Sequence, residues 1–104
     1  MPVIEMIGKP IHVNEEGFLT EYNEWDPAIG KVLADQIGVE MTDEHWKIIN
    51  FLREDFKSEG ETATSRRVQT VGGVPVKIQF ELFPKKPAKK MAYIAGLPKP
   101  KGCV

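Results

Sequence analysis

The chain has 104 residues, of which 41% are hydrophobic and 28% are charged, as is typical of one small globular domain. No apolar run is long enough to span a bilayer, and the N-terminus lacks the features of a signal peptide, so we expect a cytoplasmic protein without membrane contacts. A single cysteine excludes an internal disulfide or a multi-thiolate metal site, and His12 and His45 lack metal-ligand spacing, so neither metal nor cofactor is expected.

The formal net charge of -1 conceals an uneven distribution of charge along the chain. Residues 1–61 contain 14 acidic and 5 basic side chains, whereas residues 62–104 contain 1 acidic and 9 basic side chains. A basic C-terminal part suggests contact with an anionic surface, either nucleic acid or an acidic protein cleft. Lysines that merely keep the surface soluble explain the same pattern equally well.

The first twenty residues predict short strands. Residues 3–7 and 10–13 fit two strands around a turn at residues 8–9, and residues 18–19 would add a third short strand. Strands of this size are not stable alone, so we expect the hairpin to pack on helices.

Two helices with clear start and stop signals follow. Asp26 can cap a helix that begins at Pro27 and ends before Gly38. Thr42 can cap a second helix that ends near Gly60. Their apolar residues recur at helical spacing, at Ile29, Val32, Leu33, Ile37, Trp46, Ile49, Leu52 and Phe56.

Shorter helices are predicted in the C-terminal half. Residues 65–71 fit a short helix that two glycines break, and a last helix opens at Pro87 and stops at Gly96. Between them, Pro75 can open a helix, but the alternation of apolar residues over 74–80 suits a strand equally well.

The glycine-broken helices between residues 42 and 83 could form a helix-turn-helix, a unit that often binds DNA through its second helix. The candidate recognition stretch, residues 74–83, carries little polar besides Lys77 and Glu81. Such a stretch is more typical of a core element than of a groove reader. His45 lies beside Trp46 at a helix start, and we interpret it as structural.

Residues 97–104 differ from the rest of the chain. Pro98 and Pro100 restrict the backbone and lack N–H donors, so this segment can enter neither a helix nor a central strand. The seven residues beyond Gly96 reach roughly 20 Å when extended. Cys103 is next to last, although cysteine is normally buried. We therefore interpret residues 97–104 as a flexible arm that presents a thiol.

Cys103 is the strongest candidate for chemistry, because an exposed thiol oxidises and cross-links unless it is used. A terminal cysteine without a role remains the alternative from position alone. Lys99 and Lys101 favour the thiolate, whereas the terminal carboxylate opposes it. Arg66 and Arg67 are candidates for binding an anion, although most such pairs are solvated.

Several motifs occur together along the chain. They are residues 16–19, Trp25, residues 42–54, Leu82-Phe83-Pro84, Pro87-Ala88-Lys89, Ile94-Ala95-Gly96-Leu97-Pro98-Lys99-Pro100 and Gly102-Cys103-Val104. On these residues the sequence resembles the DsrC/TusE family, which comprises gamma-subunit-like proteins of dissimilatory sulfite reductase and their sulfur-relay relatives. The resemblance covers nearly the whole chain, and the C-terminal motif is specific.

The resemblance implies a single domain over residues 1–104 with an α+β, mostly helical fold. A small N-terminal β-hairpin would pack on a helical bundle with a helix-turn-helix-like element, and residues 97–104 would form the flexible arm. Cys103 would be the catalytic, sulfur-carrying residue. Arg67 resembles an arginine near the docking surface of the arm, and with Lys99 and Lys101 it is a candidate for binding an anion or a sulfur species.

Two departures from the family pattern narrow these expectations. Redox-active members carry a second cysteine at the position of Ala92, and without it this chain cannot form their internal disulfide. It resembles instead the single-cysteine TusE-like members, which pass persulfide sulfur along a relay. The segment formed by residues 70–80 is also shorter than in the longer family members. Because this segment contributes to partner contacts, the partners can differ from theirs.

We therefore predict a sulfur carrier, rather than a self-contained enzyme, that accepts and passes on persulfide sulfur through Cys103. The relay would serve a pathway like tRNA thiolation or sulfur oxidation, with sulfur-donor and sulfur-acceptor proteins, including sulfite reductase, as candidate partners. The alternatives are a regulatory or DNA-binding helix-turn-helix module, and a docking subunit of a dissimilatory sulfite reductase.

Overall fold

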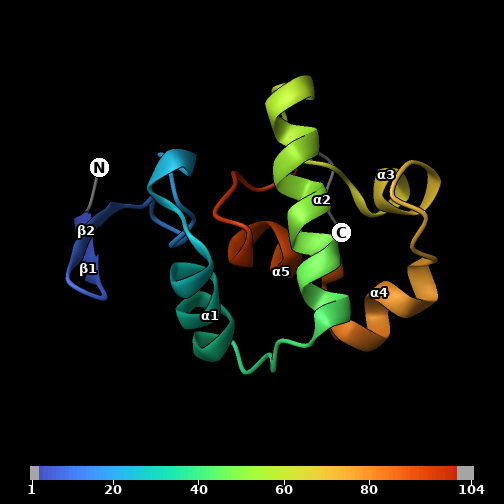
Figure 1. Cartoon of the computed structure of the whole chain (residues 1–104), viewed down its shortest axis with the longest axis horizontal. Helices are drawn as coiled ribbons and strands as arrows, with labels where there is room; N and C mark the ends of the chain where they lie inside the picture. Colours follow the sequence, from blue (N-terminus) through green and yellow to red (C-terminus); the bar gives the residue numbers. More distant parts are fainter. Residues whose placement is uncertain (1–2, 101–104) are drawn as a thin grey trace.

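This computed structural model describes residues 3–100, except for the side chains of Val3 and Met6. Within this range the chain forms a hairpin, a short 3-10 helix and five α-helices. The elements are β1 (Val3–Met6), β2 (Lys9–His12), η1 (Tyr22–Glu24), α1 (Pro27–Gln36), α2 (Asp43–Glu59), α3 (Ser65–Thr70), α4 (Val76–Leu82) and α5 (Pro87–Ile94). Helix α2 runs through the middle beside α5, with α1 and the hairpin toward one end and α3 and α4 toward the other (Figure 1). The predicted fold class is confirmed.

The hairpin turns at Ile7 and Gly8, one residue earlier than predicted. Met6 pairs with Lys9, which leaves two residues in the loop, and φ is 52° at Ile7 and 74° at Gly8. Positive φ at both central residues gives the turn whose twist matches that of the flanking strands. The prediction missed this position because a β-branched residue rarely adopts the left-handed conformation.

The turn predicts that Ile7→Asn stabilises the protein. Asparagine tolerates positive φ, and asparagine followed by glycine is the favoured pair for this turn. Ile7 is 58% exposed, so the substitution sacrifices little apolar burial. We expect a gain of about 0.5–1 kcal/mol in the free energy of unfolding, measured by chemical denaturation. Ile4→Asn, within β1, should instead destabilise the protein, and a loss of stability in both variants would contradict the turn geometry.

The hairpin packs on α1 through its buried face, as predicted. Ile11 of β2, together with Val13 and Leu19, contacts Ile29 and Leu33 of α1 in one apolar cluster. The predicted third strand is reduced to one bridge, between Val13 and Leu19. Sharp folding of the intervening loop, residues 14–18, leaves too little extended chain to pair, and the 3-10 helix η1 follows without a signal that we recognised.

The long helices begin at the predicted caps. The Asp26 carboxylate accepts a hydrogen bond from the Ile29 N–H at 2.9 Å. At the start of α2, the Thr42 N–H donates to His45 Nδ1 at 3.1 Å, and His45 Nε2 lies 2.8 Å from the Leu82 carbonyl oxygen. His45 thus joins the start of α2 to the end of α4, which confirms that it is structural.

Residues 76–82 form the helix α4, and the alternative of a strand is wrong. Gln79 and Phe83, four residues apart, are both fully buried, which is helical spacing. The Gln79 Nε2 donates to the carbonyl oxygens of Ser65 and Val74, at 3.0 and 2.9 Å. This buried amide fastens α4 to α3 and completes the helix-turn-helix-like element.

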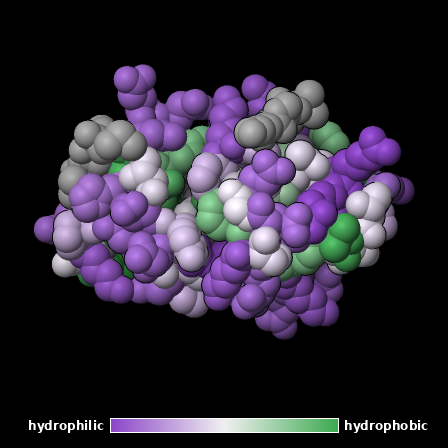
Figure 2. Space-filling view, turned by 90° about the horizontal axis from the view of Figure 1, so that it is seen from above, coloured by the Kyte–Doolittle hydropathy of each residue, from purple (hydrophilic) through white to green (hydrophobic). Residues whose placement is uncertain are grey.

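Most apolar side chains of the described residues are inside the protein. The main core draws on α2 and α5, and its fully buried members include Ile49, Leu52, Met91 and Leu97. The face shown in Figure 2 is largely hydrophilic, with hydrophobic residues in small areas. Among the described residues, the large hydrophobic side chains that are exposed are Ile4, Ile7, Tyr22, Val71 and Phe80. No helix within residues 3–100 is long and apolar enough to cross a membrane.

Candidate functional site

Cys103 and Lys101, two of the predicted site residues, lie outside the described residues. The structure describes the root of the C-terminal segment, which we define as residues 97–100, and the surface around it. This root is not the free arm that the sequence predicted, because Leu97 is fully buried in the main core and Pro100 is buried as well. Proline prevents helix formation in this segment, but it does not prevent packing.

A glycine turn at the end of α5 directs the chain into the root. Gly96 has φ 70°, and its N–H donates to the Tyr93 carbonyl at 3.2 Å. The Leu97 N–H donates to the Ala92 carbonyl at 3.1 Å. These two bonds form a Schellman motif, in which the residue after the glycine makes a hydrophobic contact. Leu97 supplies that contact and holds the start of the root inside the core.

Two side chains from distant elements bind the last carbonyls of α5. The Trp25 indole N–H donates to the Ile94 carbonyl at 2.7 Å, and Arg53 Nη1 donates to the Ala95 carbonyl at 2.7 Å. The Arg53 guanidinium carbon lies 4.3 Å from the Trp25 ring centroid, so the two side chains also support each other. Burial lowers the pKa of Arg53 from its ordinary value. The end of α5 is therefore held by side chains as well as by its backbone.

Beyond the bond from the Leu97 N–H, Pro98 and Lys99 of the root also make polar contacts with the body. The Thr62 hydroxyl donates to the Pro98 carbonyl at 2.7 Å. The Lys99 ammonium lies 3.6 Å from the Glu16 carboxylate, which also receives Lys89 of α5 at 3.8 Å. A cavity of about 250 Å³ adjoins Thr62, Pro98 and Lys99. Lys99, a predicted site residue, is thus a surface partner of Glu16.

Arg67 of α3 forms an ion pair with Asp55 of α2. Its Nε donates to one carboxylate oxygen of Asp55 at 2.8 Å, and its Nη2 donates to the other at 2.7 Å. These hydrogen bonds raise the pKa of Arg67. Glu59 lies 3.8 Å from the same Nη2. Arg67 thus already pairs with two carboxylates, and its neighbour Arg66 is exposed.

Ala92, where redox-active members of the resembled family carry a second cysteine, is fully buried in α5. Its carbonyl receives the Leu97 N–H of the root. The position lies two residues before the last residue of α5, and its methyl group offers no redox chemistry.

The exposed face of α4 offers little to nucleic acid. Lys77, Phe80 and Glu81 are exposed, so the helix presents one basic and one acidic side chain. Base and phosphate contacts draw mainly on arginine, lysine and amide side chains. Gln79, the amide of this helix, is buried.

Sequence reasoning assigned no role to Thr62, Arg53 or Trp25 in holding the root. Trp25 and Arg53 belong to the motifs that carry the family resemblance, and this was the only feature of the sequence that marked them as candidates for a shared role. Their contacts join residues that are 69 and 42 positions apart, so no local pattern indicates them. A paired-lysine pattern at residues 85–86 and 89–90 was also visible, at the i, i+4 spacing that places lysines on one helix face.

A family model described as DsrC-like protein matches residues 5–104. The chain belongs to the DsrC-like protein family. Among curated relatives, it is 37% identical over 98 residues to the gamma subunit of dissimilatory-type sulfite reductase from Nitratidesulfovibrio vulgaris, with 93% of each chain covered. It is 36% identical over 106 residues to the sulfurtransferase TusE of Escherichia coli, with 93% of this chain and 95% of that protein covered.

Solved structures agree with this assignment. The NMR structure of DsrC from Allochromatium vinosum has a TM-score of 0.81 and 41% identity, covering 98% of this chain and 97% of that one. The crystal structure of the oxidized gamma subunit of dissimilatory sulfite reductase from Archaeoglobus fulgidus has a TM-score of 0.80 and 38% identity, covering 99% and 100%. The fold expected from the resemblance is thereby confirmed.

Proposed function

We propose that this DsrC-like chain is a sulfur carrier that accepts persulfide sulfur at Cys103 from one protein and passes it to another. The observation that carries the proposal is the match to the family through residue 104, with Cys103 as the sole thiol. Relatives of similar length are named sulfurtransferase, and the chain has no second cysteine with which to form an internal disulfide.

Acceptance of sulfur requires no acid or base from the carrier. The Cys103 thiolate attacks the outer sulfur of a donor persulfide, a new sulfur–sulfur bond forms, and the donor's own sulfur–sulfur bond breaks. The donor leaves as a thiolate, and the transferred sulfur keeps its proton. Delivery repeats the exchange, because an acceptor thiolate attacks the outer sulfur and Cys103 leaves as a thiolate. No net oxidant or reductant is consumed.

The basic residues predicted as binding residues have separate proposed roles. Lys99 and Lys101 raise the positive charge near Cys103, which favours the thiolate and an anionic sulfur species. Arg67 has two of its nitrogens occupied by Asp55, so an anion at this residue would use Nη1. We propose Arg67 as part of the surface on which a partner lies.

The partners proposed are a sulfur donor and a sulfur acceptor, both proteins with persulfide or thiol chemistry. One relative is named as a sulfite reductase subunit and others as sulfurtransferases, so both contexts supply candidates. A reducing cytoplasm suits such a carrier, because its thiol stays free of disulfides there.

Incubation with a protein persulfide donor tests the proposal. We expect intact-protein mass spectrometry to find one added sulfur on the wild-type chain and none on Cys103→Ser, because the hydroxyl is not a sulfur nucleophile. Treatment of the loaded chain with a thiol should remove the sulfur. Equal sulfur uptake by Cys103→Ser, or no uptake by wild type from a donor that loads another carrier, would overturn the carrier function.

A further inference from the structure

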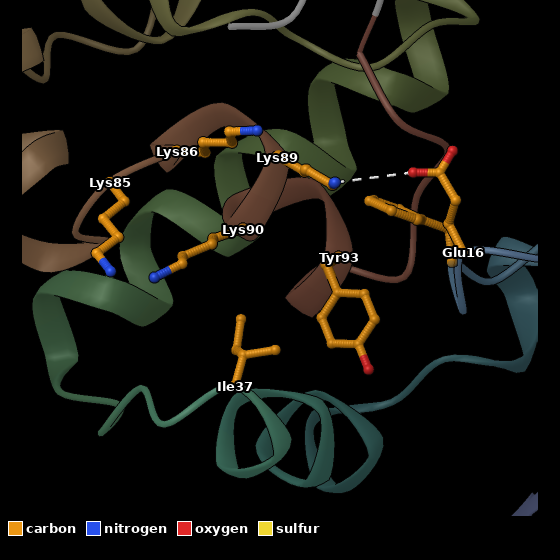
Figure 3. Close-up of a pocket in the computed structure, with 8 residues that line it drawn as sticks. Glu16, Ile37, Lys85, Lys86, Lys89, Lys90 and Tyr93 are labelled. Atoms are coloured by element: carbon orange, nitrogen blue, oxygen red, sulfur yellow. Dashed lines mark ion pairs between the residues drawn. The ribbon is translucent and has the colours of Figure 1, made fainter.

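A lysine-rimmed groove lies at the start of α5, and we define it by Lys85, Lys86, Lys89, Lys90 and the apolar residues beneath them. The groove encloses about 420 Å³ between the start of α5 and the end of α1. Lys85 and Lys90 extend into the same space, while Lys89 points toward Glu16 (Figure 3). Four lysines therefore line one hollow of a chain whose net charge is -1, and two of them, Lys85 and Lys90, extend into the same space (Figure 3).

The charge of this groove is largely uncompensated. Lys89 reaches Glu16 at 3.8 Å, but Lys85, Lys86 and Lys90 form no ion pair within residues 3–100. Like charges that crowd together repel one another, so an anion that enters the groove relieves an existing repulsion. The N-terminus of α5 also opens here, and no side chain caps it. Both features favour negative charge on the occupant.

The floor of the groove is apolar. It is formed by Ile37, by the half-buried ring of Tyr93 and by Phe18, whose ring meets that of Tyr93 edge-on at 5.6 Å between centroids. The Tyr93 hydroxyl donates to the Gln36 side chain at 2.7 Å, and this bond holds the ring in place. Burial of the same side chain raises the pKa of Tyr93. An occupant that fills this groove presents an apolar side chain as well as carboxylates.

The surroundings favour a protein segment over nucleic acid. The floor of the groove is formed by the apolar surfaces of Phe18, Ile37 and Tyr93. A run of phosphates would contact the lysines at the rim but would leave this apolar floor without a partner. A short acidic peptide needs only the groove itself, because its charges are local and its apolar side chain has a floor to contact.

We propose that the groove docks an acidic segment of a partner protein, one that carries an apolar side chain between its carboxylates. The groove adjoins the root of the C-terminal segment, because the Glu16 carboxylate contacts both Lys89 of the groove and Lys99 of the root. A partner seated there lies beside the chain that leads to Cys103. The inference thus rests on the proposed function and identifies the chemistry of the partner's docking segment.

A labelled peptide of about ten residues, with aspartates and glutamates around one central leucine, serves as the probe. We expect binding by fluorescence anisotropy, with amide chemical-shift changes confined to the groove. Lys85→Glu with Lys90→Glu should weaken binding about tenfold or more, because two attractions become repulsions. The matched control, Lys47→Glu with Lys77→Glu, makes the same charge change at two exposed lysines without ion pairs in the described part of the chain and should bind within about twofold.

Three results would overturn the docking groove. They are equal weakening in both double variants, unchanged affinity when the central leucine of the peptide becomes serine, and tighter binding of a single-stranded RNA of equal charge to the same residues. Sulfur loading of Cys103 from a small-molecule persulfide needs no docking. Failure of that loading would refute the carrier function, whereas loss of peptide binding alone would refute the groove.

Discussion

Replacing Gly96 with alanine should lower the free energy of unfolding by about 2–5 kcal/mol, through the left-handed backbone and overpacking together. Gly96 has φ 70°, which alanine adopts only with strain. A Cβ at this position would lie 2.5 Å from Trp25 Cδ1, closer than two carbon atoms can approach. Trp25 cannot move aside freely, because its indole N–H is bonded to the Ile94 carbonyl. Chemical denaturation followed by circular dichroism measures the loss.

Gly38→Ala is the matched control for this variant. Gly38 has φ 73°, nearly that of Gly96, but nothing lies within 4 Å of the Cβ position. The control should therefore lose only the backbone contribution, about 1–2 kcal/mol. The difference between the two variants measures the contact with Trp25. If both lost the same amount, the close approach of Trp25 to the end of α5 would be refuted.

Arg53→Met should be the second large effect, with a loss of about 2–4 kcal/mol from the hydrogen bond to Ala95 and the contact with Trp25. Methionine retains much of the side-chain volume but donates nothing. The Ala95 carbonyl then loses its hydrogen bond from Arg53 Nη1 at 2.7 Å, and the Tyr22 carbonyl loses the one from Arg53 Nη2 at 2.9 Å. The melting temperature should fall by on the order of 10 °C for a domain of this size.

Two further substitutions separate the causes of this effect. Arg66→Met removes an exposed guanidinium and should change stability by less than about 0.5 kcal/mol. Arg53→Lys keeps the charge but loses the planar fork, so its stability should lie between those of wild type and Arg53→Met. A wild-type melting temperature for Arg53→Met would mean that the end of α5 does not depend on this side chain.

The helices could be read from the sequence because their signals are local. Asp26 and Thr42 stand immediately before α1 and α2, and each start was correct to the residue. The turn at Ile7 was misplaced because its conformation is unusual for that residue. Residues 76–82 were ambiguous because apolar residues alternated, and the burial of Gln79 that favours a helix depends on contacts with distant residues.

The candidate site was only partly predictable, for the same physical reason. Cys103 was identified from its position and from the family motif, and its role stays a prediction. The burial of Leu97 and the bond from Thr62 to Pro98 join segments that are far apart in the chain. Proline-rich composition correctly excluded a helix after Gly96, but it carried no information on packing. The pairing of Arg67 with Asp55 was missed likewise, since it links two helices.

The burial of Pro100 also limits how far from the body of the protein the Cys103 thiol can act. Cys103 is the third residue after Pro100, a length of chain that spans at most about 11 Å. Under the proposed carrier function, a partner sulfur farther than this backbone length from Pro100 would exchange only after Leu97 and Pro100 leave their packed positions. Distance from Pro100 would then select which bound partners exchange sulfur quickly.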